Sequence, residues 1–278
     1  MGEIDQAALL RAADLIADAD ALVIAAGAGI GIDSGLPDFR GASGFWRAYP
    51  ALGAAGMAFH EIASPAAFRR DLALAWGFYG HRLALYRDTV PHAGFALLRK
   101  WGGRMPHGSR VYTSNVDGQF QRAGFDGGQI AECHGSIHHL QCLARCGDAV
   151  WSADGYTPQV DATACRLRNA PPACPHCGGP ARPNVLMFND WDWVAARTDA
   201  QLGALDSWLG SVRRPVVLEI GAGTAIPSVR RFGHRVVEQC GGRLVRINPD
   251  DDSVPHRADI AIAARALPAL EALGRLLG

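Results

Sequence analysis

Two close pairs of cysteines give the sequence its clearest chemical signal. Three residues separate Cys142 from Cys146, and two separate Cys174 from Cys177. Thiol pairs on separate turns can supply the four sulfur ligands of a tetrahedral zinc ion. Four unconnected reduced cysteines are the alternative, and Cys165, between the pairs, could stand in as a ligand. We expect a structural zinc ion on the two pairs, because no catalytic motif lies between them.

A glycine-rich stretch, GAGIGIDSGLPDFRG, runs from Gly27 to Gly41. Glycines let backbone amides come close to a pyrophosphate group. The fingerprint of dinucleotide-dependent dehydrogenases, G-x-G-x-x-G, is not met, because the third glycine comes one residue early at Gly31. An acidic residue at the end of a clear second strand, which would bind a ribose, is also missing. The stretch therefore predicts phosphate binding without hydride transfer.

The same stretch ends in an acid, an aromatic ring and a cation, Asp38, Phe39 and Arg40. Arginine can pair with a phosphate through two parallel hydrogen bonds. Phe39 can cover a planar ring or a cationic carbon. This set suits a reaction that breaks the bond to nicotinamide better than one that transfers a hydride to it.

Short apolar runs predict the elements that position these residues. The runs are rich in Val, Ile or Leu without clean alternation, as expected for parallel strands buried on both faces. They lie at 21–26, 110–113, 215–220, 243–247 and 258–263. Helical patterns lie between them, with apolar faces at 6–18 and 267–277. The chain therefore predicts an open α/β sheet, with the glycine-rich stretch at its ligand-binding carboxyl edge.

Two segments interrupt this alternation. Residues from about 43 to 92 carry aromatic side chains at helical spacing and predict a helical insertion over the ligand edge. Residues from about 138 to 182 are rich in Cys, Pro, Gly and Ala and have weak periodicity. Such a segment cannot easily bury a core of its own, so a metal ion is expected to organise it.

Composition narrows the class of protein. The 278 residues contain 27 Lys+Arg and 27 Asp+Glu, so the formal net charge is zero and gives no bulk electrostatic case for nucleic acid or membrane partners. The acidic start does not resemble a signal peptide. No apolar run approaches the ~18 residues of a membrane span. We expect a cytoplasmic protein whose seven cysteines serve metal binding or reactivity rather than disulfides.

Spaced blocks over nearly the whole chain resemble the sirtuins, the NAD-dependent protein deacylases. A single block would be weak evidence, but all the blocks occur in the fixed order of the family, which makes the resemblance specific. The blocks are the glycine-rich stretch, TSNVDGQFQRAG (113–124), CHGS (133–136), the two cysteine pairs, RPNVLMFND (182–190), GAGT (221–224) and RIN (246–248).

The resemblance implies a Rossmann-like NAD-binding domain and a smaller domain. The large domain would comprise 1–42, 93–137 and 183–278. The small domain would combine a helical module, 43–92, with a zinc-binding module, 138–182. NAD, as co-substrate, and an acyl-lysine protein or peptide would enter the cleft between the domains from opposite sides.

The resemblance also assigns catalytic roles. In the sirtuin reaction an acyl-lysine oxygen attacks C1′ of the nicotinamide ribose, and a histidine then deprotonates a ribose hydroxyl. Histidine suits such a base because its pKa lies near neutrality. His134, in the CHGS block, matches that role, against the alternative of an ordinary core histidine. Asn115 and Asp117 match the residues that hold the nicotinamide ribose and carboxamide.

Further residues match NAD contacts of the family. Asp38 and Phe39 would seat and cover the nicotinamide end, Arg40 and the glycines would hold phosphates, and Asn248 would meet the adenosine ribose. The full expected set is Gly27, Ala28, Gly29, Asp38, Phe39, Arg40, Ser114, Asn115, Asp117, His134, Gly223, Thr224 and Asn248.

A Tyr-x-x-Arg pattern, Tyr79 and Arg82, is similar to the pair that marks sirtuins acting on malonyl-, succinyl- and glutaryl-lysine. On a helix, positions i and i+3 share a face. A phenol and a guanidinium there could bind the distal carboxylate of an acidic acyl group. The alternative is an amphipathic helix with a core Tyr79 and a solvent-facing Arg82. The segment 41–47, GASGFWR, resembles the same branch.

The chain departs from the family at several positions. Gly31 replaces a serine, and Ser114 replaces a glutamine near the ribose. The peptide-binding loop reads Phe188-Asn189-Asp190 in place of Phe-Gly-Glu. After Thr224, the residues that help to grip a peptide are replaced by 225–230, AIPSVR. NAD chemistry is therefore expected, while the register of a bound peptide stays open.

Three functions follow from these observations. The first is NAD-dependent lysine deacylation, forming O-acyl-ADP-ribose. The second, motivated by the altered peptide loops, is ADP-ribosyl transfer or NAD hydrolysis on the same scaffold. The third is an NAD-binding module without turnover, against which His134, Asn115 and Asp117 together argue.

Overall fold

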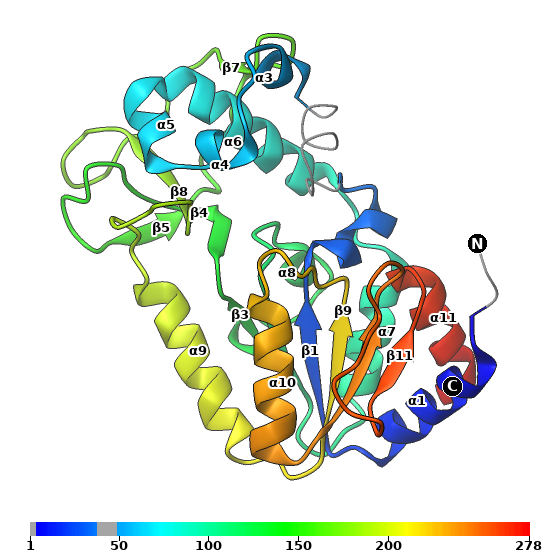
Figure 1. Ribbon diagram of the computed structural model, residues 1–278. Coiled ribbons are helices and arrows are strands. Elements are labelled where there is room, and N and C mark those ends of the chain that lie inside the picture. Colours follow the sequence, from blue (N-terminus) through cyan, green and yellow to red (C-terminus); the bar gives the residue numbers. More distant parts are fainter. Residues whose placement is uncertain (1–3, 38–48) are drawn as a thin grey trace.

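The computed structural model describes residues 4–37 and 49–278 (Figure 1). Its strands are β1 (Ala21–Ala26), β2 (Ser109–Thr113), β3 (Ile130–Glu132), β4 (Gly135–Cys142), β5 (Val150–Ser152), β6 (Val160–Asp161), β7 (Arg166–Leu167), β8 (Ala181–Val185), β9 (Pro215–Ile220), β10 (Arg243–Ile247) and β11 (Ile260–Ile262). Its α-helices are α1 (Gln6–Asp18), α3 (Pro50–Ala54), α4 (Phe59–Ile62), α5 (Pro65–Arg70), α6 (Leu72–Asp88), α7 (Ala93–Gly102), α8 (Gln119–Arg122), α9 (Ala196–Leu209), α10 (Ser228–Cys240) and α11 (Ala266–Leu277). Two 3₁₀ helices are η1 (Ala28–Ser34) and η2 (Gly127–Gln129).

Six parallel strands form the main sheet, in the order β11-β10-β9-β1-β2-β3. The five apolar runs read from the sequence all lie in this sheet, which confirms the predicted α/β class. Strand β1 lies between β9 and β2 and is buried along its whole length. The sequence did not reveal β3, which has only three residues.

Helices cover both faces of this sheet (Figure 1). Helices α1, α7 and α11 share a core with one face, where Leu22, Ile24 and Phe95 are packed. Helices α9 and α10 share a second core with the other face, where Val23, Val217 and Phe232 are packed. Because apolar helix faces cover the strands on both sides, the loops at the carboxyl edge are held by a rigid frame.

A second, smaller part lies above that carboxyl edge in Figure 1. It combines helices α3 to α6 with the antiparallel strands β5, β4 and β8, which share a third apolar core. The indole nitrogen of Trp76, in α6, donates to the carbonyl of Ala181, in β8, at 2.9 Å. At Gly77, also in α6, an added Cβ would lie 2.0 Å from the carbonyl oxygen of Cys165. The backbone of α6 therefore packs directly against the cysteine-rich segment, with no side chain between them. The helical and cysteine-rich segments therefore form one packed unit.

Strands β4 and β8 connect the two parts. The expected domain boundaries at 137/138 and 182/183 fall inside these paired strands. The chain thus passes between the two parts along continuous strands.

In the part of the chain that the structure describes, no helix has the length and apolar character needed to cross a membrane.

Candidate active site

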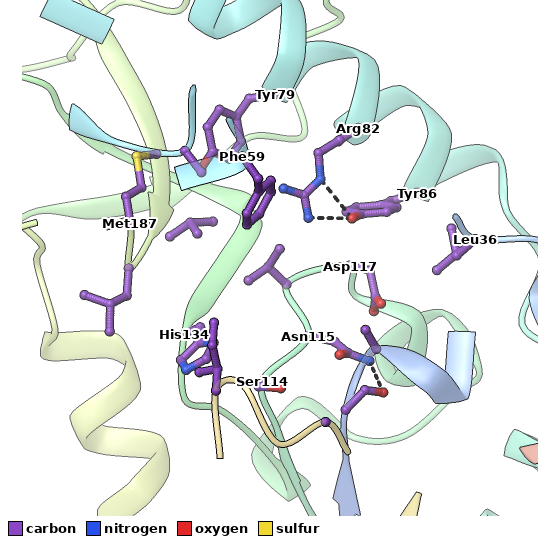
Figure 2. Close-up of a pocket in the computed structure, with 18 of the residues that line it drawn as sticks. Leu36, Phe59, Tyr79, Arg82, Tyr86, Ser114, Asn115, Asp117, His134 and Met187 are labelled. Atoms are coloured by element: carbon purple, nitrogen blue, oxygen red, sulfur yellow. Dashed lines mark hydrogen bonds between the residues drawn. The ribbon is translucent and has the colours of Figure 1, made fainter. Parts of the chain in front are cut away.

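A cavity of about 510 Å³ lies between the carboxyl edge of the main sheet and the smaller part. Its sheet side is formed by residues that follow β1, β2, β3 and β9. Its other side is formed by helices α4 and α6 and by residues 185–188 at the end of β8. Figure 2 shows Arg82 and Tyr86 at one end, with Ser114, Asn115 and His134 at the other. The cavity is thus lined by segments that lie far apart in the sequence.

His134 lines this cavity directly after β3, on the way into β4. Its Nε2 atom lies 3.3 Å from the hydroxyl of Ser228. Burial lowers the pKa of His134 below 6.5, and a backbone hydrogen bond with Ser114 opposes this shift. The imidazole is therefore neutral at pH 7, which is the state a general base requires.

Asn115 and Asp117 follow β2 and are buried polar residues in the cavity wall. The side-chain amide of Asn115 donates to the carbonyl of Gly27 at 3.1 Å. A carboxylate oxygen of Asp117 accepts from the backbone N–H of Gln119 at 3.0 Å. Burial raises the pKa of Asp117 to about 6. A carboxyl group withdrawn from water in this way is typical of a functional site.

His138 supports the same loop from β4. Its Nε2 atom lies 2.9 Å from the carbonyl oxygen of Asp117. His138 and His139 match no sequence motif, and a position at the surface or in a turn is the simplest expectation for them. The structure contradicts it, because both are partly buried in strand β4.

The glycines of the first loop pack against the loop after β9. A Cβ at Gly27 would lie 2.6 Å from the carbonyl oxygen of Gly221, and one at Gly29 would lie 2.6 Å from Gly221 Cα. At Gly31 a Cβ would lie 2.9 Å from a methyl group of Leu36, which lines the cavity. Gly31 therefore makes room for Leu36, a role that the sequence did not reveal.

The structure places only some of the expected NAD-contact residues in the cavity wall. Gly27, Ala28, Ser114 and Gly223 line the cavity together with Asn115, Asp117 and His134. Thr224 is exposed, and Asn248 is buried beside the loop after β9. The Asn248 amide donates to Ala222, and its oxygen accepts from two backbone N–H groups. Asp38, Phe39 and Arg40 lie outside the described residues, as does the segment 41–47.

Tyr79 and Arg82 line the cavity from α6. Arg82 is only 8% exposed, so the alternative of a solvent-facing arginine is wrong. Its Nε and Nη2 atoms donate to the hydroxyl of Tyr86 at 3.0 and 2.7 Å. Burial raises the pKa of Tyr79 to about 12, against the effect of the nearby Arg82. Both tyrosines therefore remain neutral phenols at physiological pH.

Several cavity residues were missed by the sequence reading. Tyr86 is one of the aromatic residues at helical spacing in the segment 43–92, and Phe59 belongs to no motif. Phe188 and Ile226 lie in the two altered stretches, 188–190 and 225–230, but their place in the cavity wall was not predicted. That loop is fixed by a fully buried ion pair, since Arg182 Nη2 lies 2.8 Å from Asp190.

The four predicted zinc ligands converge. The sulfur atoms of Cys142, Cys146, Cys174 and Cys177 all lie within 4.8 Å of one another. Two of the separations are 3.6 and 3.7 Å. Tetrahedral zinc with Zn–S bonds of about 2.3 Å would place sulfurs about 3.8 Å apart, so the four thiols fit a structural zinc ion. Cys165 is buried in the apolar core and does not belong to this cluster.

Comparison with known proteins decides the family. The family model described as the Sir2 family matches residues 27–198. The chain belongs to the Sir2 family. A Pyrobaculum aerophilum protein named NAD-dependent protein deacylase 2 is 32% identical over 92% of this chain and 91% of its own length. A Pseudomonas aeruginosa protein named NAD-dependent protein deacylase 1 is 32% identical over 95% of this chain and 96% of its own.

The fold is also that of solved Sir2 structures. A Sir2 homologue crystallised as an NAD complex superimposes with a TM-score of 0.73, at 24% identity, covering 96% of this chain and 93% of that one. The cavity fits the same ligand class. Bare glycine backbone meets at the loops after β1 and β9, and buried Asn115 and Asp117 supply polar contacts beside it.

Proposed function

We propose that this Sir2-family protein is an NAD-dependent protein-lysine deacylase. The observation that carries the proposal is the meeting of His134, Asn115 and Asp117 in one cavity with the glycine loop on one side and α6 on the other. The similar proteins named as protein deacylases support the same activity. In this reaction the acyl-lysine oxygen displaces nicotinamide from C1′ of NAD. The acyl group then passes to a ribose hydroxyl and one water molecule is consumed, giving free lysine and O-acyl-ADP-ribose.

His134 would act as the general base. Its neutral imidazole has one nitrogen that can accept a proton from a ribose hydroxyl. The partly buried ring is held in place by Ser228, whose hydroxyl lies 3.3 Å from Nε2, and by a backbone hydrogen bond with Ser114. The ring can therefore take the proton without first losing one to solvent at pH 7.

Asn115 and Asp117 would orient the nicotinamide end. The bond from Asn115 to Gly27 fixes the amide against the glycine loop, so its oxygen can turn toward a ribose hydroxyl. Asp117, held by Gln119 and by His138, can accept from a carboxamide N–H. Gly27, Ala28 and Gly223 would lie beside the phosphates. We propose that Asp38, Phe39, Arg40, Gly29, Thr224 and Asn248 complete the NAD site, as the family resemblance implies.

The acyl group would enter between α6 and residues 185–188. Apolar side chains of Phe59, Met187 and Phe188 line this side, and Arg82 places a guanidinium group in it. Tyr79 and Arg82 would bind the distal carboxylate of a malonyl, succinyl or glutaryl group. A buried guanidinium in an otherwise apolar wall favours an acidic acyl chain over acetyl, because its charge is little screened there.

The remaining assignments follow this function. The two parts would correspond to an NAD-binding domain (1–42, 93–137 and 183–278) and a small domain with a helical module (43–92) and a zinc module (138–182). The thiol cluster would hold zinc as a structural ion. We also propose a cytoplasmic location and acyl-lysine proteins as partners.

One reaction tests the proposal against its alternatives. The protein would be incubated with NAD and either an acetyl- or a succinyl-lysine peptide, and the products resolved by mass spectrometry. Peptide-dependent O-acyl-ADP-ribose is the expected result. The altered segment 225–230 favours the second candidate, which would give free ADP-ribose without peptide, or ADP-ribosylated protein. No release of nicotinamide would reject both enzyme functions.

A further inference from the structure

Tyr86 forms a side-chain contact with Arg82 that no sequence motif predicts. The Nε and Nη2 atoms lie on one edge of the guanidinium, and both donate to the same phenol oxygen, at 3.0 and 2.7 Å. The two residues are one helical turn apart on α6, so the helix itself sets their spacing. Two bonds to one acceptor fix the direction of the guanidinium plane more firmly than one bond would.

Aromatic rings hold the same group from other sides. The Cζ atom of Arg82 lies 5.2 Å from the ring centre of Phe78, 5.8 Å from that of Tyr79 and 5.4 Å from that of Tyr86. These distances are within the range of cation–π attraction. Figure 2 shows the guanidinium beside Tyr86, on the cavity side of α6.

Tyr86, the hydrogen-bond partner of Arg82, is uncharged. Burial raises the pKa of Tyr86, so the phenol keeps its proton at physiological pH. A carboxylate in the same place would cancel the charge of Arg82. The phenol instead accepts the hydrogen bonds along the Nε/Nη2 edge without neutralising the guanidinium. A guanidinium has a second edge, formed by its two terminal nitrogens, that can meet a carboxylate.

Tyr86 is itself tied to the sheet side of the cavity. Its backbone carbonyl accepts from the side-chain amide of Gln119 at 3.3 Å. The backbone N–H of Gln119 donates to Asp117 at 3.0 Å. The end of α6 is therefore anchored to the loop that carries Asp117, so the phenol has a fixed position relative to the proposed nicotinamide site.

We propose that Tyr86 is a positioning residue that aims Arg82 at the distal carboxylate of an acidic acyl-lysine. This inference rests on the proposed deacylase function and extends its acyl site beyond Tyr79 and Arg82. Tyr86 acts through Arg82, so it sets the preference for acidic over neutral acyl groups.

The test is Tyr86→Phe, which removes one oxygen and preserves the ring. For the full-length protein, kcat and KM would be measured on acetyl- and succinyl-lysine versions of one peptide. The ratio of succinyl to acetyl kcat/KM is expected to fall about tenfold, mainly through KM for the succinyl peptide, because bonds to a charged group are lost. Calorimetry of the succinyl peptide without NAD should show a matching loss of affinity.

Tyr156→Phe is the matched control, since it removes a phenol that bonds to Ala170 outside the cavity lining. It should leave the ratio unchanged. An unchanged or higher ratio in Tyr86→Phe would overturn the inference, and so would a wild-type protein active only on acetyl peptide. A wild-type protein that deacylates neither peptide would instead overturn the proposed function. Equal losses on both peptides would show that Tyr86 has only a structural role.

Discussion

The hydroxyl of Ser228 lies 3.3 Å from Nε2 of His134, although 94 positions separate them in the sequence. Ser228 is the first residue of α10, and His134 follows β3. A serine hydroxyl can donate to a neutral imidazole and can rotate to accept from an imidazolium. Ser228 can therefore hold the ring in both protonation states that a general base passes through. It belongs to the segment 225–230, which departs from the family pattern.

Replacing Ser228 with alanine should slow deacylation through kcat and leave KM for NAD nearly unchanged. Loss of one hydrogen bond to the base predicts a fall of about fivefold. Ser228→Thr, which keeps the hydroxyl, should recover most of the rate. Ser207→Ala removes a hydroxyl that bonds within α9 and is the control. Steady-state kinetics measure all three, and a full rate in Ser228→Ala would show that the contact has no catalytic value.

His134→Ala should abolish deacylation, with a fall in kcat between about a hundredfold and ten thousandfold. In the wild type, burial lowers the pKa of His134, so the ring stays neutral to below pH 6.5. Because the base acts in its neutral form, the acidic limb of the kcat profile should lie below pH 6.5. Measuring kcat between pH 5 and 8 tests this, and an acidic limb above pH 7 would assign the essential base to another group.

His139 should make folding stability sensitive to pH. Burial, with help from Arg197 and His138, lowers the pKa of His139 from 6.5 to about 4. Between these values the unfolded chain binds a proton that the folded chain does not, so the free energy of unfolding falls as pH decreases from 6.5 to 4. Asp117 affects stability in the opposite direction, because burial raises its pKa to about 6 in the folded chain. Its contribution to the free energy of unfolding is therefore lost as pH rises through 6.

Urea unfolding of wild type and His139→Asn at several pH values would measure this effect. The variant should show a shallower decrease in unfolding free energy between pH 6.5 and 4. Parallel curves for the two proteins would mean that His139 does not titrate differently in the folded and unfolded chains.

The sheet could be predicted from sequence because its strands are buried on both faces. The run 21–26, for example, contains only aliphatic residues, and the apolar face read at 6–18 matches the bounds of α1. Strand β3 was missed because three residues are too few for a pattern. Strand β4 was harder to predict because it carries His138 and Gln141, polar side chains whose partners, Asp117 and Asp192, lie 21 and 51 positions away in the sequence.

The site was predictable where the chemistry demands particular residue types at short spacing. The cysteine pairs belong to this class, whereas the role expected of His134 came from the family resemblance. The place of Tyr86 in the cavity wall was not predictable, because periodicity cannot distinguish an aromatic residue that fills a core from one that lines a cavity. The contact of Ser228 was not predictable either, because it depends on the position of His134 in three dimensions. Gly31 likewise depends on the side chain of Leu36.

The thiol cluster predicts about one zinc ion per chain. Cys142→Ser should lose that zinc and lower the melting temperature by at least ~5 °C, since each kcal/mol lost corresponds to roughly 2–4 °C in a domain of this size. Cys240→Ser is the control, because Cys240 ends α10 and does not belong to the cluster. Metal analysis with thermal denaturation measures both variants. Full zinc content in Cys142→Ser would remove that residue from the ligand set.

Gly29→Ala should weaken NAD binding and lower stability together. The new methyl would lie 2.6 Å from Gly221 Cα and 3.0 Å from its carbonyl oxygen, so one backbone must move. The loops after β1 and β9 would separate, and these loops hold Gly27, Ala28 and Gly223 in the cavity wall. Such overpacking typically costs about 1–3 kcal/mol.

Gly203→Ala provides the matched comparison. This exposed glycine lies inside α9, and a Cβ there would have no atom within 4 Å. Alanine is a better helix former than glycine, so this variant should be neutral or more stable by up to ~1 kcal/mol. Calorimetric NAD titration and urea unfolding of both variants separate the local clash from a general effect of adding a methyl group. If Gly29→Ala bound NAD as tightly as Gly203→Ala, the bare-backbone contact between the two loops would not be what shapes the NAD site.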